Sequence, residues 1–212
     1  MVCRVICISR SLGAGGEEVG RRVAKALGFR YADQEIIIRA AEKAGVLPES
    51  AAQAEHTPGL IARILESIGS TPDAVGWSAS AVLPSPTKPA YEGLFERVIR
   101  ETVDRGDVVI VAHGASIPVA GMSGLLRVLV TASPRVRAER LAREANLKAA
   151  EARKAIADSD RQRREYLRRF YDIRQELPTH YDLVVNTDVL TLPLAAKLVV
   201  SAAKGQRVAK RV

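Results

Sequence analysis

A glycine-rich segment near the N-terminus has the composition of a phosphate-binding loop but lacks the lysine of such loops. From Ile8 the chain reads I-S-R-S-L-G-A-G-G-E, after a short apolar run. Phosphate loops commonly read G-x-x-x-x-G-K-[ST], where the lysine contacts phosphates and the hydroxyl contacts Mg²⁺. Here the corresponding positions hold Arg10, Gly15, Gly16 and Glu17. If the loop binds a nucleotide, another residue must supply the positive charge.

Backbone groups alone could give this loop affinity for an anion. Its glycines allow a tight fold in which successive N–H groups converge, and a helix expected to begin near Glu17 adds the positive end of its dipole. The alternative is a glycine-rich turn without a ligand, in which Glu17 and Glu18 merely favour the start of the helix. The residues that we expect to hold nucleotide phosphates are Ser11, Leu12, Gly13, Ala14, Gly15, Gly16, Glu17 and Glu18.

Alternating strand and helix patterns place the loop in an α/β domain. Short β-branched runs, apolar on both faces as in a buried parallel sheet, lie at 5–8, 108–111, 126–130 and 183–185. Amphipathic helix patterns occupy 17–27, 92–103 and 134–145, the last behind the potential cap Ser133. No linker divides the chain, so we expect one domain over residues 1–212.

Two excursions interrupt this alternation. The first, at about 34–90, is too long for a simple crossover, and the second, at about 146–175, is a highly charged helical stretch. Ligands of α/β sheets bind beyond the carboxyl ends of the strands, so two excursions from those ends could close over a ligand.

The charge balance favours phosphate-bearing ligands. The net charge is +8 and the pI about 9.8, but aromatic residues make up only 4% of the chain. Arginines crowd into 135–143 and 161–174 with few aromatic side chains among them for base stacking, which argues against a nucleic-acid binder.

Cysteine usage suits a reducing, cytoplasmic environment. Cys3 and Cys7 flank an expected strand, where a separation of four residues spans roughly 13 Å, too far for a disulfide. The N-terminus has no pattern of a signal peptide, and Pro193 and Lys197 interrupt the apolar stretch at 190–203. We therefore predict no signal peptide and no membrane contact.

Several segments together resemble the cytidylate kinase-like family of P-loop kinases. The loop resembles the family pattern I-S-R-x-x-G-[SA]-G-G, which also lacks the lysine. LGFRYADQEIIIRAA, VVIVAHGA, VLVTASPRVRAERLA, DSDRQRREYLRRFY and HYDLVVNTDVLTL resemble further family segments, so the likeness covers nearly the whole chain. It implies a three-layer P-loop kinase fold with a five-stranded parallel sheet, and ATP-dependent, Mg²⁺-assisted phosphoryl transfer to a nucleoside monophosphate, CMP or dCMP.

The resemblance also implies roles on the acceptor side. Asp33 would orient the acceptor or a magnesium-bound water, with a helix cap as the alternative. Arg39 would bind the acceptor phosphate with its planar fork, with a solvated helix arginine as the alternative. His113 stands where many relatives carry arginine. It would bind the same acceptor less well than arginine does, or it would bind a different acceptor.

Arginines of the second excursion and its approach would serve the transferring group. Asp160 and Arg163, spaced i and i+3, share a helix face, and Arg140 precedes them. Asp160 is the third residue, with Arg39 and His113, that we expect to bind the acceptor. We expect Arg10, aided by Arg140 and Arg163, to supply the charge of the missing lysine. Two other functions stay open: a nucleotide-binding regulatory module with little or no turnover, and a kinase of another small acceptor.

Overall fold

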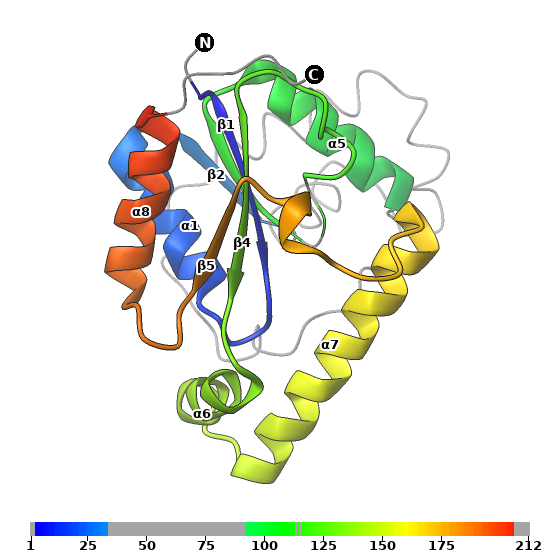
Figure 1. Ribbon diagram of the computed structural model, residues 1–212, viewed down its shortest axis with the longest axis vertical. Coiled ribbons are helices and arrows are strands. Elements are labelled where there is room, and N and C mark those ends of the chain that lie inside the picture. Colours follow the sequence, from blue (N-terminus) through cyan, green and yellow to red (C-terminus); the bar gives the residue numbers. More distant parts are fainter. Residues whose placement is uncertain (1–2, 34–91, 113, 115, 206–212) are drawn as a thin grey trace, which may run out of the picture.

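Five parallel strands form one sheet in the order β2-β3-β1-β4-β5 in the computed structural model, which describes residues 3–33, 92–112, 114 and 116–205 (Figure 1). The parallel five-stranded sheet predicted from the sequence is therefore confirmed. The strands are β1 (Val5–Arg10), β2 (Arg30–Asp33), β3 (Val108–Val111), β4 (Leu125–Thr131) and β5 (Leu183–Asn186).

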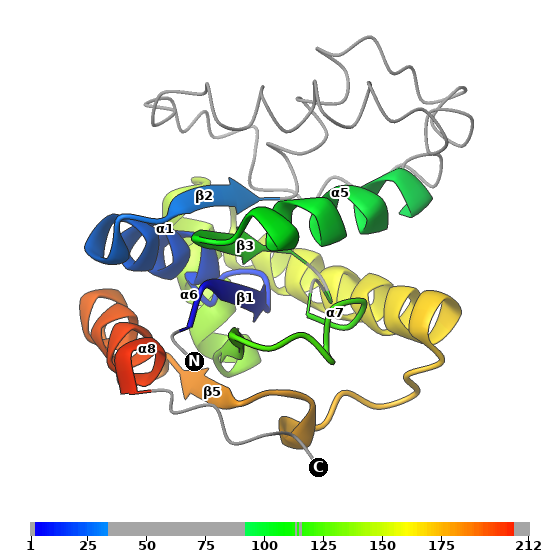
Figure 2. The same ribbon diagram turned by 90° about the horizontal axis from the view of Figure 1, so that it is seen from above.

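Helices cover both faces of the sheet and complete three layers. Viewed from above, α1 and α8 lie on one side of the strands, and α5 and α7 lie on the other (Figure 2). The predicted first excursion, about 34–90, lies outside the described residues. The helices are α1 (Gly16–Leu27), α5 (Glu92–Arg105), α6 (Pro134–Glu144), α7 (Ala149–Tyr171) and α8 (Leu192–Gly205), with a short 3₁₀ helix η4 (Pro178–His180).

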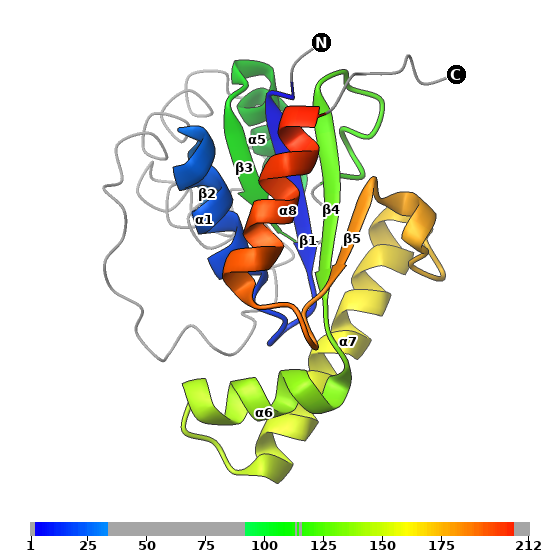
Figure 3. The ribbon, with the colours of Figure 1, turned by 60° about the vertical axis from the view of Figure 1, so that its left-hand side comes forward.

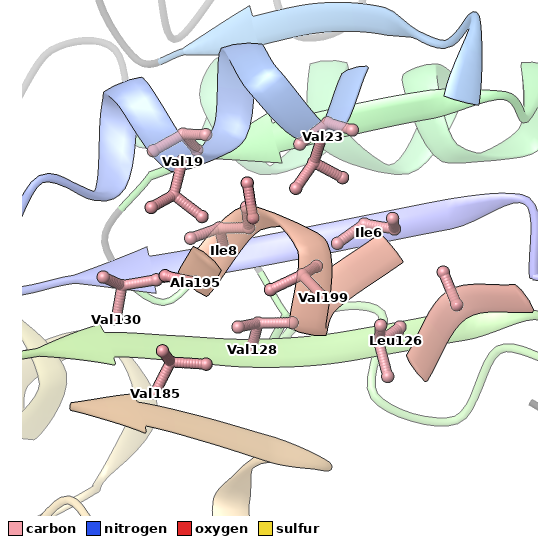
Figure 4. Close-up of a cluster of buried hydrophobic side chains, with 14 of the residues drawn as sticks. Ile6, Ile8, Val19, Val23, Leu126, Val128, Val130, Val185, Ala195 and Val199 are labelled. Carbon is pink, nitrogen blue, oxygen red and sulfur yellow. The ribbon is translucent and has the colours of Figure 1, made fainter. Parts of the chain in front are cut away.

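The main core fixes α1 against the carboxyl half of β1. Side chains two residues apart on β1 and β4 point to the same face and pack beneath α1 and α8 (Figure 4). Gly20 permits close contact, because a Cβ there would lie 2.5 Å from Val111 Cγ2. The first turn of α1 is thereby held at the carboxyl end of the sheet. The labelled core residues are Ile6, Ile8, Val19, Val23, Leu126, Val128, Val130, Val185, Ala195 and Val199.

Helices α6 and α7 form a hairpin beyond the carboxyl ends of the central strands (Figure 3). Helix α6 begins as predicted, with Pro134 in its first turn and the Ser133 Oγ accepting a hydrogen bond from the Val136 N–H at 3.4 Å. Apolar residues of the two helices form a small second cluster, against which Leu12 of the glycine loop also packs. The hairpin is therefore packed directly on the loop.

Both cysteines are buried free thiols, as predicted, although β1 begins at Val5 and so leaves Cys3 just outside the strand. Burial raises the pKa of the Cys7 thiol to about 12, so this thiol is inert at neutral pH. No helix among the described residues has the length and apolar character needed to cross a bilayer.

Candidate phosphate-binding site

The glycine loop between β1 and α1 is folded tightly against two other elements. Gly13 and Gly15 have φ values of 75° and 80°, in the left-handed region that glycine adopts without strain. A Cβ on Gly13 would lie 2.6 Å from the carbonyl oxygen of Arg137, and one on Gly15 would lie 2.5 Å from Leu192 Cδ2. Glycine is therefore required at both positions by backbone conformation and by the space available.

The first turn of α1 opens onto this loop. Gly15 is its N-cap and has no side chain to accept hydrogen bonds from the first N–H groups, which also lack acceptors within the helix. Glu17 and Glu18 lie in this first turn, and Glu18 pairs with Arg22 at 2.6 Å. The loop thus offers backbone donors at the positive end of a helix dipole, as anion sites commonly do.

The side chain of Arg10 lies across Gly16. A Cβ on Gly16 would be only 2.3 Å from Arg10 Cβ and 2.8 Å from Arg10 Cγ. Arg10 Nε donates to Glu17 Oε1 at 2.5 Å, whereas the buried Arg10 Nη1 has no hydrogen-bond partner within the described part of the chain. A buried guanidinium nitrogen beside the loop therefore has no acceptor among the described residues.

The Arg10–Glu17 pair fixes the charge state of the carboxylate. Burial by itself would raise the pKa of Glu17, but the adjacent Arg10 guanidinium outweighs it and lowers the pKa below its ordinary value. Glu17 is therefore an anion at neutral pH, and it holds the Nε edge of Arg10.

Asp33 ends β2 as a largely buried carboxylate. Its Oδ2 lies 3.6 Å from Arg21 Nη2. The guanidinium carbon of Arg21 also lies 5.1 Å from the centre of the Tyr31 ring, a cation–π contact. Burial, followed by the nearby Asp33 charge, raises the pKa of Tyr31 well above its usual value. The sequence left two roles open for Asp33, acceptor binding and helix capping. In the described part of the structure its carboxylate contacts Arg21 on α1.

Arg140 ties α6 to the loop and to the end of β5. Its Nη1 donates to Thr187 Oγ1 at 2.8 Å and lies 3.4 Å from the Ala14 carbonyl oxygen, and its Nη2 donates to the Thr187 carbonyl. Thr187 Oγ1 in turn donates to the Ala14 carbonyl at 2.9 Å. The predicted site residue Arg140 therefore touches the phosphate loop, through the backbone of Ala14.

Asp160 faces α6 instead of the loop. Its two carboxylate oxygens each accept a hydrogen bond of 2.8 Å from Arg137, whose side chain is only 5% exposed. Asp160 also lines a groove of about 950 Å³ between α6 and α7, and none of the described loop residues line that groove. Sequence reasoning missed Arg137, although the R-A-x-R pattern that pointed to Arg140 contains it.

Arg163 is buried among protein acceptors. Its side chain is 6% exposed, and it forms a two-pronged ion pair with Glu176, with Nε donating to Oε2 at 2.9 Å and Nη2 donating to Oε1. Its Nη2 also donates to Ser9 Oγ at 2.8 Å, and its Nη1 donates to the Arg10 carbonyl at 3.2 Å. Sequence reasoning gave no role to Glu176, because nothing near it in the chain indicates a buried partner.

The structure thus gathers part of the predicted set. Arg10, Glu17 and Arg140 surround the loop formed by residues 11–16, and Arg163 reaches the backbone at the start of that loop. Asp33 and Asp160 pair with Arg21 and Arg137. The predicted acceptor residues Arg39 and His113 lie outside the described residues.

The chain is similar to one protein family and to several solved structures. A profile of the cytidylate kinase-like family matches residues 5–189, whereas no curated protein sequence matches the chain. Among solved structures, an uncharacterized protein from Eubacterium ventriosum has a TM-score of 0.64 at 12% identity, covering 96% of this chain and 99% of that chain. Shikimate kinase from Acinetobacter baumannii, in complex with shikimate, has a TM-score of 0.48 at 15% identity, covering 93% of this chain and 91% of that chain. Dephospho-CoA kinase from Campylobacter jejuni has a TM-score of 0.40 at 15% identity, covering 96% of this chain and 98% of that chain.

The buried ion pair predicts an acid-sensitive contribution to stability. Glu176→Gln leaves the Arg163 guanidinium buried without a counter-charge, so we expect the free energy of unfolding at pH 7 to fall by about 3 kcal/mol. Burial tends to raise the pKa of Glu176, but hydrogen bonding and charge from Arg163 lower it overall. The ionised carboxylate therefore stabilises the fold above about pH 4.3, the ordinary value for glutamate, and this contribution is lost as the pH falls through the lowered folded pKa.

Urea unfolding between pH 3 and pH 7 measures this effect. The difference between wild type and Glu176→Gln should be full at pH 7 and should shrink below about pH 4. Glu139→Gln is the matched control, because Glu139 forms an exposed ion pair with Arg135 and should contribute little. A difference of the same size at pH 3 and pH 7 would contradict the assignment.

Proposed function

Because this chain belongs to the cytidylate kinase-like family, we propose that it transfers the terminal phosphoryl group of ATP to a nucleoside monophosphate, with CMP or dCMP as the acceptor. The family and the three-layer P-loop kinase fold support a phosphotransferase that uses a nucleotide. The identity of the acceptor and the way in which a loop without lysine works are the parts that we propose here.

The exchange of residues between positions 10 and 16 is the observation that carries the proposal. An ordinary loop has glycine at the first of these positions and lysine at the second, whereas this chain has arginine at the first and glycine at the second. The 2.3 Å approach between Arg10 Cβ and a Cβ built on Gly16 means that only one of the two positions can carry a long side chain. In our proposal the cation enters the site from the end of β1, and Gly16 leaves room for it.

Arg10 and the backbone then divide the work of binding and transfer. The loop N–H groups hold the donor phosphates, and Arg10 Nη1, which has no hydrogen-bond partner among the described residues, donates to an oxygen of the transferring group. Glu17 orients that edge by holding Nε. Phosphoryl transfer depends chiefly on positioned charge and on exclusion of water, so this arrangement supplies what the chemistry requires.

The carboxylates near the loop fit the needs of Mg²⁺. Magnesium prefers oxygen ligands and is commonly held by one or two carboxylates together with substrate phosphates. Glu17, at the position of the usual hydroxyl, and Asp33, at the end of β2, would hold it; the described residues contain no cluster of three or more His, Cys, Asp or Glu. When bound, Mg²⁺ neutralises charge on the donor phosphates.

Replacing Arg10 by alanine separates binding from transfer. Backbone contacts to the nucleotide survive in Arg10→Ala, but the charge that opposes the transition state is lost, so kcat should fall by about 100-fold or more while ATP affinity falls by less than about 10-fold. Equilibrium ATP binding paired with single-turnover rates measures both quantities. Wild-type values of both would leave Arg10 a structural residue only.

Exchanging the two residues tests the steric argument directly. Gly16→Lys alone should impair nucleotide binding, because the new Cβ would clash with the Arg10 side chain. Backbone strain adds nothing to this effect, since φ at Gly16 lies outside the left-handed region. The double variant Arg10→Gly, Gly16→Lys recreates the ordinary spacing and should recover at least about 10-fold in kcat over Arg10→Gly, since a charge is regained. A double variant no better than Arg10→Gly would contradict the exchange.

Product formation with a panel of acceptors tests the function itself. ADP release should require CMP or dCMP, and Arg39→Ala should lower kcat/KM for that acceptor by about 10 to 1000-fold, as expected for a lost charged hydrogen bond. ATP affinity should be unchanged in this variant. Nucleotide binding without turnover on any acceptor would instead favour a regulatory module, and turnover with a different acceptor would favour a kinase of that compound.

A further inference from the structure

The Ser9 hydroxyl joins three segments that are distant in the sequence. Ser9 is the penultimate residue of β1 and is 2% exposed. Its Oγ accepts a hydrogen bond of 2.8 Å from Arg163 Nη2 on α7 and one of 3.4 Å from the Gly114 N–H, just beyond β3. A single buried oxygen therefore links the strand that leads into the phosphate loop, the helical hairpin and the turn after the neighbouring strand.

The turn at Gly114 also packs directly on α7. Gly114 has a φ of 67°, and a Cβ there would lie 3.2 Å from Leu167 Cδ2 and 3.4 Å from the Tyr171 ring. Gly114 follows His113, which the family resemblance implies to be an acceptor-side residue. The hydrogen bond to Ser9 thus connects the start of the donor loop to the neighbour of a proposed acceptor residue.

Arg163 holds the backbone from which Arg10 extends. Its Nη1 donates to the Arg10 carbonyl, and its Nε and Nη2 are engaged by Glu176. Turning this guanidinium toward a bound phosphate would break these contacts and leave the Glu176 charge partly buried without its partner. The geometry therefore favours a fixed arginine over one that moves with each turnover.

Glu176 and Tyr181 keep the arginine in place. The Tyr181 hydroxyl donates to Glu176 Oε1, and burial raises the pKa of Tyr181 to about 12, so this hydroxyl remains a donor at neutral pH. The Glu176 carboxylate balances the charge of Arg163 and fixes the plane of its fork. We call Ser9, Arg163 and Glu176 the clamp.

We infer that the clamp couples the donor side of the site to the acceptor side, and that Arg163 is a positioning residue that acts through Ser9 and the Arg10 backbone. This inference rests on the proposed function. Reacting groups must be placed within a fraction of an ångström of their productive geometry, and a misplacement of about 1 Å can lower a rate by about 100-fold. The clamp meets this need because Ser9 accepts a 2.8 Å bond from Arg163 and a 3.4 Å bond from the turn that follows His113, while Arg163 also holds the Arg10 carbonyl.

Binding of the nonhydrolysable ATP analogue AMPPNP and of CMP, each with and without the other, measures the coupling. In the wild type with Mg²⁺, we expect AMPPNP to tighten CMP binding by about 5-fold or more. Ser9→Ala and Arg163→Lys should bring this ratio close to 1 and lower kcat by about 10 to 100-fold, while AMPPNP affinity alone changes by less than about 3-fold. Lysine retains the charge but cannot reach Ser9, Arg10 and Glu176 together.

The neighbouring residue provides the matched control. Arg164→Lys changes an exposed arginine on the same helix and should keep wild-type coupling and kcat. Ser9→Ala removes one oxygen only, so it tests the clamp even if Arg163→Lys fails to fold, which the melting temperature reveals. If Ser9→Ala shows coupling and kcat within about 3-fold of the Arg164→Lys values, the inference is overturned.

Three other outcomes are equally informative. If Arg163→Lys loses AMPPNP affinity by more than about 10-fold while Ser9→Ala keeps both that affinity and the coupling, Arg163 touches phosphate directly and the inference is overturned. Wild-type protein that binds AMPPNP and transfers phosphate to CMP without any coupling overturns the inference alone. Wild-type protein that does not bind AMPPNP overturns the proposed function, and the inference with it.

Discussion

The site is organised by the narrow space between the end of β1 and the first turn of α1. Core packing holds the helix so close to the sheet that the region between positions 10 and 16 admits only one long side chain. Once arginine occupies the strand position, glycine must occupy the helix position, and in our proposal the cation then enters the site from the sheet. The absence of the loop lysine is thus the steric counterpart of an arginine on the neighbouring strand.

A cation on a strand is positioned differently from a lysine on a helix. The β1 backbone is paired with β4, in register from Val5 with Leu125 to Arg10 with Val130, so Arg10 starts from a fixed point. The acceptor has to be held at the correct distance from Arg10, because the paired strand cannot move to meet the acceptor. The contacts of Arg163 with Ser9 and with the Arg10 carbonyl serve this purpose, since they tie the end of β1 to α7.

The sequence predicted the frame of the site better than its contacts. β-branched runs, glycine turns and helical spacing are local signals, and they correctly indicated β1, β3, β4 and β5, the loop, and the helices α1, α5 and α6. The fifth strand, β2, has no β-branched run, and the five-stranded sheet followed from the family resemblance. The i, i+3 spacing of Asp160 and Arg163 showed only that both lie on one side of α7. Their partners, Arg137 and Glu176, lie 23 and 13 residues away, and tertiary packing selects them. The predictions for Arg39 and His113 concern residues outside the described part of the chain and stay predictions.

Pairing of the buried arginines explains how a basic protein can hold a specific anion site. Arg10, Arg137 and Arg163 each face a carboxylate, so the charges of these three arginines are balanced locally despite the +8 of the chain. Exposed arginines such as Arg153 and Arg164 contribute a long-range field that salt screens and that selects no particular anion. In our proposal selectivity comes instead from short contacts, namely those of the loop N–H groups and of Arg10 Nη1, which has no hydrogen-bond partner among the described residues. Because a neutralised interior does not repel further cations, such a site can also accept a divalent ion together with its phosphates.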